Sequence, residues 1–319
     1  MTANFPPPRF VDANGVKLAV YEAGGTSAPP VVLIHGWPEI AYSWKNQIPA
    51  LAAAGFRAIA CDLKGFGRSD APDDKSLYDI RHMTDDLAAL MDALKIERAV
   101  LVGHDWGGAI VWPMAQLHAD RVKGVVGVCT PHRRPPPIPP LEIIKKRFGE
   151  RHYFLIFQQE GVAEAAFEGR EEDFFRWMFR KPIAREAWPK LFPKAFDLVG
   201  RFGERRPADP ERALLGADDL AVYVEAYRRS GFRGGINLYR NINRNWEIMR
   251  AVDPVIRAPA LYVGAELDLF LPPESADGME AIVPDLEKRL LKDCGHWATW
   301  EQPGELNVVL IDWLKRRTC

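Results

Sequence analysis

The sequence predicts an α/β fold in which a mostly parallel central sheet is flanked by helices and interrupted by a helical insertion. Two patterns support this prediction. Short apolar runs alternate with stretches of helical periodicity up to Pro131, as in successive βαβ units. The alternation stops at Pro131–Pro140, which holds six prolines. From Leu141 to about Arg250 the periodicity is helical, without a buried strand, and strand patterns resume at Ala260.

Each element follows from a local pattern. A hairpin is predicted to begin at Arg9, because Asn14-Gly15 favours a two-residue turn and apolar residues alternate after it at Val16, Leu18 and Val20. Short strand patterns, several of them apolar throughout as in doubly buried strands, occur at Val31–Ile34, Arg57–Cys61, Ala99–Val102, Val122–Cys129, Ala260–Val263 and Lys288–Leu291. Helical spacing occurs at Trp44–Ala53, Thr84–Leu94, Gly107–Leu117 and Glu305–Arg317. We therefore expect a core of residues 1–131 and 251–319 and a helical cap of residues 132–250.

Composition and charge argue against several classes of protein. The chain has 42 basic and 43 acidic residues, a formal net charge of -1, so we expect neither nucleic acid nor a membrane as partner. Its N-terminus lacks a signal-peptide pattern, and its apolar runs are far shorter than the roughly 20 residues of a membrane-spanning helix. The four cysteines form no CxxC pair, which disfavours zinc and disulfides and favours a cytoplasmic location. A homodimer is left open.

The segment Gly103-His104-Asp105-Trp106-Gly107 lies between a predicted strand and a predicted helix. This is the pattern of a nucleophile elbow, in which small residues flank a nucleophile on a strained turn. Asp105 occupies the nucleophile position. A carboxylate attacks sp³ carbon without help from a base and forms an ester on its own side chain, so its targets are epoxides and alkyl halides. The alternative is that Asp105 only caps the helix that follows.

An ester on Asp105 must be hydrolysed, and two downstream residues are placed to activate water. Asp268 follows one predicted strand and His296 follows the next. The order nucleophile, acid, histidine is that of the α/β-hydrolase fold. We expect His296 to take a proton from water, while Asp268 fixes the tautomer and stabilises the imidazolium. Glu266 is a competing acid.

The loop His35–Glu39 directly follows a predicted strand. Oxyanion holes of this fold take one backbone N–H from this loop and one from the residue after the nucleophile. The expected donors are therefore Trp37 and Trp106, since Pro38 has no N–H. Glu39 and His104 either position the hydrolytic water or are buried polar groups that are satisfied locally. The sequence leaves that choice open.

These motifs resemble those of the α/β-hydrolase-fold epoxide hydrolases, the group that includes the soluble mammalian and plant enzymes. The resemblance extends over nearly the whole chain, and its core motifs are His35–Glu39, Asp62–Asp70, Gly103–Gly108 and Asp293–Trp297. It implies that two cap tyrosines bind and protonate the epoxide oxygen. Tyr153 precedes Phe157–Glu164 and Tyr239 lies in Gly231–Asn241; both segments look like those of the family, with Gln159-Glu160 replacing the usual Glu-Pro. It also implies a small apolar epoxide and water as reactants, without cofactor or metal.

Two other functions compete with this interpretation. A haloalkane dehalogenase would use the same nucleophile, acid and base. However, the loop offers Trp37 where such enzymes usually offer Asn, and the tyrosines would have no task. A non-catalytic binding protein of the same fold is the other alternative, because fold alone does not prove catalysis. A binding module needs neither the triad nor the paired tyrosines.

Overall fold

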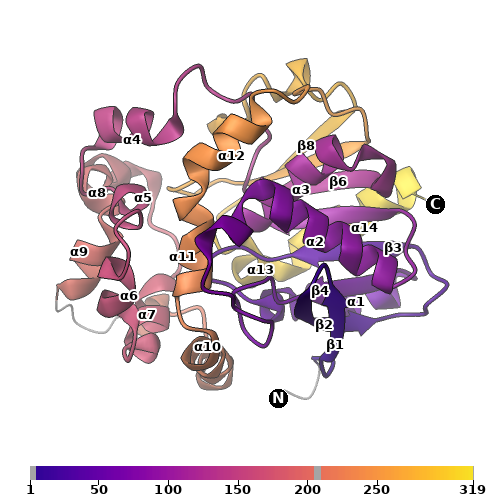
Figure 1. The fold of residues 1–319 in the computed structure, drawn as a ribbon, viewed down its shortest axis with the longest axis horizontal. Coiled ribbons are helices and arrows are strands. Elements are labelled where there is room, and N and C mark those ends of the chain that lie inside the picture. The colour runs from indigo at the N-terminus through magenta and orange to yellow at the C-terminus, as the bar shows by residue number, and fades with distance from the viewer. Residues whose placement is uncertain (1–4, 205–209, 319) are drawn as a thin grey trace.

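The computed structural model describes residues 5–204 and 210–318, which form an eight-stranded sheet with helices on both faces and a helical layer beside it (Figure 1). The strand order is β1-β2-β4-β3-β5-β6-β7-β8. Strand β2 pairs antiparallel with both β1 and β4, and all pairs from β4 to β8 are parallel. The strands are β1 (Arg9–Ala13), β2 (Val16–Ala23), β3 (Pro30–Ile34), β4 (Arg57–Cys61), β5 (Ala99–His104), β6 (Val122–Val128), β7 (Ala260–Ala265) and β8 (Leu286–Leu291). The predicted fold class is confirmed.

Two hydrophobic cores sandwich the sheet, because successive residues of a strand point to opposite faces. In β3, Val32 and Ile34 belong to the core that includes α2 and α3. Val31 and Leu33 belong to the core that includes α1 and α14. Each fully buried aliphatic side chain contributes about 1.5–3 kcal/mol, so strands that are apolar on both faces hold the sheet between its helices. The helices of the sheet domain are α1 (Gln47–Ala53), α2 (Ile80–Ala93), α3 (Trp106–Leu117), α13 (Ala298–Glu301) and α14 (Pro303–Thr318).

The segment between β6 and β7 forms the helical layer to the left of the sheet in Figure 1. Phenylalanines hold it together: the Phe174 ring packs against Phe167 at 4.7 Å and Phe232 at 4.9 Å between centroids. In the described part of the chain, no helix has both the length and the apolar character of a membrane span. The helices of this layer are α4 (Pro140–Phe148), α5 (Tyr153–Ile156), α6 (Val162–Phe167), α7 (Glu171–Met178), α8 (Trp188–Ala195), α9 (Leu198–Gly203), α10 (Ala217–Ser230), α11 (Arg233–Arg240) and α12 (Ile242–Met249).

Two predicted helix starts are wrong. The helix expected from Trp44 is divided into a 3₁₀ turn that ends at Trp44 and helix α1, which begins at Gln47. Helix α2 begins at Ile80, before the expected start at Thr84. The reason is a cap, because the Asp79 carboxylate accepts a hydrogen bond from the His82 N–H at 3.0 Å. Helical spacing of apolar residues does not detect such a cap.

Candidate active site

Asp105 lies at the tip of a sharp turn between β5 and α3. Its φ of 51° falls in a region that non-glycine residues rarely adopt. The flanking glycines make the turn possible. A Cβ on Gly103 would lie 2.2 Å from the Gly107 carbonyl oxygen, and a Cβ on Gly107 would lie 2.0 Å from the Ile34 carbonyl oxygen. The Asp105 side chain makes no capping hydrogen bond to α3, so the helix-cap alternative is wrong and the carboxylate is presented to its surroundings.

One predicted backbone donor contacts the Asp105 carboxylate. The Trp37 N–H donates to Asp105 Oδ1 at 2.8 Å. Gly36 makes this approach possible, because a Cβ there would lie 2.4 Å from the Asp105 Cβ. Sequence reasoning missed the role of Gly36, although its place beside the expected donor is a usable signal. The Trp106 N–H begins α3 directly after Asp105, and its part in an oxyanion hole stays a prediction.

The loops that follow β7 and β8 bring Asp268 and His296 to Asp105. His296 Nδ1 lies 2.8 Å from Asp268 Oδ2, and His296 Nε2 lies 3.5 Å from Asp105 Oδ2. The Asp268 side chain is fully buried, and its other oxygen accepts two backbone N–H groups at 2.9 Å. The competing acid Glu266 instead pairs with Lys292 at 3.1 Å. The structure therefore brings the expected trio together and leaves Glu266 outside it.

The surrounding charges set the protonation of His296. Burial alone would lower the pKa of this imidazole, but the Asp268 and Asp105 carboxylates outweigh it and raise the pKa well above its usual value. Burial would likewise raise the pKa of Asp268, but His296 and two backbone amides lower it below its usual range. His296 and Asp268 thus form a buried ion pair when Asp105 is ionised.

Glu39 and His104 form a second buried acid–imidazole pair. His104 Nδ1 lies 2.7 Å from Glu39 Oε2, and His104 Nε2 donates to the His296 backbone carbonyl at 2.7 Å. Both ring nitrogens of His104 are therefore occupied, which leaves none to hold water. Glu39 Oε2 also accepts the Gly36 N–H at 2.8 Å, whereas buried Oε1 has no partner among residues 5–204 and 210–318. Of the two residues, Glu39 is the one with an acceptor left for a water molecule.

The same region holds one group of side chains with the spacing of metal ligands. Donor atoms of His104, Cys129 and His296 lie within 4.8 Å of one another. The donors are poor ligands, because both nitrogens of His104 are engaged and His296 Nδ1 is bonded to Asp268. Burial also raises the pKa of the Cys129 thiol well above its usual value, which disfavours the thiolate that binds metals. This group does not fit a metal ion.

The two expected tyrosines come together above Asp105. Tyr153 begins α5 and Tyr239 belongs to α11, and their rings meet edge to face with centroids 5.4 Å apart. The Tyr239 ring also packs edge to face on Trp37 at 5.5 Å and on Trp106 at 4.9 Å. Burial raises the pKa of both phenols, and the negative charge of Asp105 adds to the rise in both. Both hydroxyls are therefore protonated at neutral pH.

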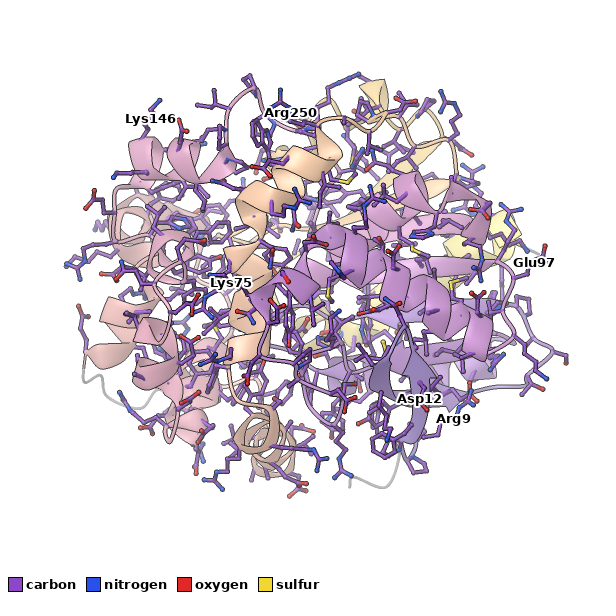
Figure 2. All side chains as sticks on the ribbon, viewed as in Figure 1. Arg9, Asp12, Lys75, Glu97, Lys146 and Arg250 are labelled. Carbon is purple, nitrogen blue, oxygen red and sulfur yellow. The ribbon has the colours of Figure 1, made fainter. Side chains whose placement is uncertain are left out.

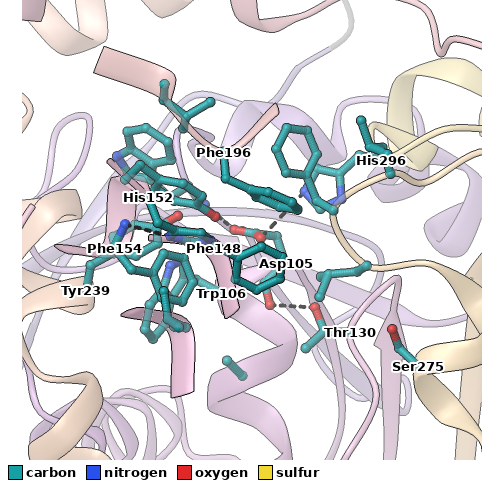
Figure 3. A pocket seen from close by; sticks show the side chains of 18 of the residues that line it. Asp105, Trp106, Thr130, Phe148, His152, Phe154, Phe196, Tyr239, Ser275 and His296 are labelled. Carbon is teal, nitrogen blue, oxygen red and sulfur yellow. Dashed lines mark hydrogen bonds and ion pairs between the residues drawn. The ribbon is translucent and has the colours of Figure 1, made fainter. Parts of the chain in front are cut away.

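A single cavity of about 500 Å³ joins these groups. Asp105, Tyr153, Tyr239 and His296 all line it, together with apolar and aromatic side chains that include Phe148, Phe154, Phe196 and Trp297. Figure 3 shows Asp105 between Tyr239 on one side and His296 on the other.

His152 is a cavity residue that sequence reasoning missed. Its ring stacks on Tyr153 with centroids 4.9 Å apart, and its Nδ1 accepts the Phe154 N–H at 3.1 Å. Burial lowers its pKa to about 4, so the ring is neutral at pH 7. It fixes the orientation of Tyr153, and nothing in the local sequence pattern signals this.

Comparisons with known proteins identify the family of the chain. A family model described as alpha/beta hydrolase fold matches residues 29–303. Epoxide hydrolase A of Mycobacterium tuberculosis is 38% identical over 316 residues, which cover 97% of each chain. Bifunctional epoxide hydrolase 2 of Sus scrofa is 40% identical over 94% of this chain but only 54% of its own length, so the chain spans about half of that relative.

Solved structures give the same result. Epoxide hydrolase A from Mycobacterium thermoresistibile superposes with a TM-score of 0.87 at 37% identity, covering 97% of this chain and 98% of that one. An epoxide hydrolase from an endophytic Streptomyces superposes with a TM-score of 0.89 at 34% identity, covering 98% of this chain and 96% of that one.

Proposed function

Since the chain belongs to the epoxide hydrolases of the alpha/beta hydrolase fold family, we propose that it opens an epoxide to a vicinal diol through an ester on Asp105. One observation carries the proposal. A carboxylate on a strained elbow, a histidine held by a buried acid, and two protonated phenols all line one largely apolar cavity. A halide leaves as a stable anion and needs no proton, so the phenols favour an epoxide over an alkyl halide. A binding module would need none of these groups.

The contacts of the two Asp105 oxygens support different tasks for them. Trp37 N–H holds Oδ1, while Oδ2 faces His296 without a direct hydrogen bond at 3.5 Å. Oδ2 is therefore the attacking atom. It forms a bond to one epoxide carbon as the bond between that carbon and the ring oxygen breaks. The ring oxygen takes a proton from Tyr153 or Tyr239, because an alkoxide is a poor leaving group.

Ester hydrolysis follows. His296 takes a proton from water, and the water oxygen attacks the carbonyl carbon of the Asp105 ester. Oδ1 carries the negative charge of the tetrahedral intermediate, stabilised by the N–H groups of Trp37 and Trp106. The intermediate then collapses, and His296 returns the proton to the departing diol. The new Asp105 carboxyl, which keeps one oxygen and one hydrogen from water, gives that proton to His296 and becomes the carboxylate again. Glu39 is the acceptor best placed to orient that water, because its Oε1 has no other partner in the described chain.

Alkylation itself prepares the base. Asp105 supplies part of the electrostatic rise in the pKa of His296, and the ester carries no charge. Its formation therefore lowers the pKa of His296 and releases the neutral imidazole that the second step needs. The proton that His296 loses restores the tyrosine that protonated the ring oxygen. The proposed reactants are a small apolar epoxide and water, and the proposed location of the protein is the cytoplasm.

A single turnover in ¹⁸O-water, with enzyme in excess, tests the covalent route. The label should enter the Asp105 side chain, detected by mass spectrometry of its peptide, and the first diol released should be unlabelled. Asp105→Ala serves as the control and should form no diol. Label found directly in the first diol would mean that water attacks the epoxide, and turnover by Asp105→Ala would remove Asp105 from the mechanism.

A further inference from the structure

The residues that line the cavity carry more positive than negative charge. Of its lining residues, Asp105 is the acidic one, whereas Arg133 and Arg147 are permanently positive. Both arginines are solvent-exposed and line the cavity, so they lie at its mouth. Arg133 belongs to the linker after β6, and Arg147 to the last turn of α4.

In the described part of the chain, neither guanidinium group has a carboxylate partner. Among the described residues, no acidic side chain forms an ion pair with either, although neighbours such as Lys145 and Arg151 are paired with Glu150 and Asp197. Arg133 donates through Nε to the Ser275 backbone carbonyl at 3.0 Å, which fixes the side chain and leaves its terminal N–H groups available. Burial and the like charge of Arg147 lower the pKa of Arg133. Two cations without a carboxylate partner among the described residues thus line the same cavity.

The surroundings extend the same sign of charge. Residues 133–151 include six basic and two acidic side chains, and residues 181–194 include four basic and one acidic, in a chain of net charge -1. The two segments meet where Phe148 of α4 packs on Phe192 of α8, with centroids 5.8 Å apart. Lys146 marks this face in Figure 2, on the opposite side of the molecule from Arg9. Such an excess of positive charge around the cavity mouth concentrates anions there.

We propose that Arg133 and Arg147 form an anion subsite that binds a carboxylate at one end of the substrate while its epoxide lies against Asp105. The inference rests on the proposed function and narrows its substrate to apolar epoxides that carry an acid group. The distance from Asp105 to Arg133 suits a substrate that contacts both residues. Thr130 Oγ1 donates to the Asp105 carbonyl at 2.8 Å, and the three residues from Thr130 to Arg133 span at most about 11 Å. Figure 3 shows Ser275, which accepts from Arg133, across Asp105 from Tyr239.

The test compares an aliphatic epoxide that ends in a carboxylate with its primary amide, which has the same length and no charge. The Arg133→Gln/Arg147→Gln variant should lose about 10-fold in kcat/KM for the acid, mainly through KM, and should turn over the amide like the wild type. Raising salt should reduce kcat/KM for the acid alone. Arg9→Gln removes the same charge far from the mouth and should change neither substrate. An unchanged ratio of acid to amide in the double variant would overturn the subsite.

A binding experiment separates this inference from the proposed function. An alkanoic acid of the same length has no epoxide, and calorimetry should show about 10-fold weaker binding to the double variant than to the wild type. If wild type opens neither epoxide but this difference appears, the reaction fails and the subsite stands. If wild type opens both epoxides and the difference is absent, only the subsite fails. Loss of binding to phosphatidylserine vesicles with an unchanged acid-to-amide ratio would assign the arginines to a lipid surface and overturn the proposal.

Discussion

Neutralising Asp105 should lower the pKa of His296, and in the proposed mechanism this shift turns the histidine into a base. Asp105→Asn imitates the charge and shape of the ester without any substrate. In the wild type the pKa of His296 is raised by Asp268 and by Asp105. The variant keeps the first carboxylate and loses the second. His296 should therefore stay above its ordinary value but titrate at lower pH than in the wild type.

The distance between the two groups sets the size of the shift. His296 Nε2 and Asp105 Oδ2 lie 3.5 Å apart. Coulomb's law at that distance gives about 5 kcal/mol for an effective dielectric constant of about 20, and about 1 kcal/mol for that of water. Since one pKa unit corresponds to about 1.4 kcal/mol, the pKa of His296 should fall by about 1 to 3 units. Partial exposure of the Asp105 side chain at the cavity wall favours the lower half of that interval.

The assay is an NMR titration of the imidazole ring, with the His296 signal identified by its loss in His296→Gln. Asp12→Asn on β1 removes a distant negative charge and should leave the titration unchanged.

Stability gives a second readout. Because the folded pKa of His296 lies above its unfolded value of about 6.5, protonation stabilises the fold below that pH, and this gain disappears as pH rises through the folded pKa. The free energy of unfolding of the wild type should thus fall with rising pH relative to Asp105→Asn. A pKa of His296 that stays equal or rises in Asp105→Asn would refute the reasoning.

Three further changes test the other parts of the site. Tyr153→Phe and Tyr239→Phe should each slow alkylation on the order of 10²-fold, as for the loss of one oxyanion-hole donor. In pre-steady-state measurements the double variant should open almost no epoxide. Wild-type rates in the double variant would exclude the phenols as acids. His296→Gln should form the ester and stall, so mass spectrometry should show substrate bound to the Asp105 peptide, and an unmodified inactive protein would mean that His296 acts earlier. Gly36→Ala should lower kcat at least about tenfold, because its Cβ would lie 2.4 Å from the Asp105 Cβ; full activity with an unchanged thermal melt would contradict this.

The fold was predictable because its signals are local. Val31–Ile34 is apolar at each position, and a strand with that composition is stable only when both of its faces are covered. The elbow is equally local, since the glycines around Asp105 relieve contacts made by the turn itself. The start of α2 escaped prediction although its cap is local as well, since Asp79 and His82 lie three residues apart. A cap at Asp79 depends on one hydrogen bond, which apolar spacing does not encode.

The cap side of the site was not predictable from physical patterns alone. Tyr153 and Tyr239 sit in unrelated helices, and only resemblance to a family singled them out. The stacking of His152 on Tyr153 and the unpaired state of Arg133 and Arg147 depend on how α4, α5 and the linker pack. Tertiary contacts that join distant segments leave no periodic trace in either segment.

The two buried acid–imidazole pairs act on one residue from two directions. Asp268 holds the ring of His296 through Nδ1, whereas His104, paired with Glu39, holds its backbone carbonyl. Neither contact involves Asp105, whose nearer oxygen is 3.5 Å from the ring. In the proposed mechanism the base is therefore positioned by contacts that do not include the nucleophile. This independence allows the nucleophile to change chemically in the first step while the geometry of the second step is already set.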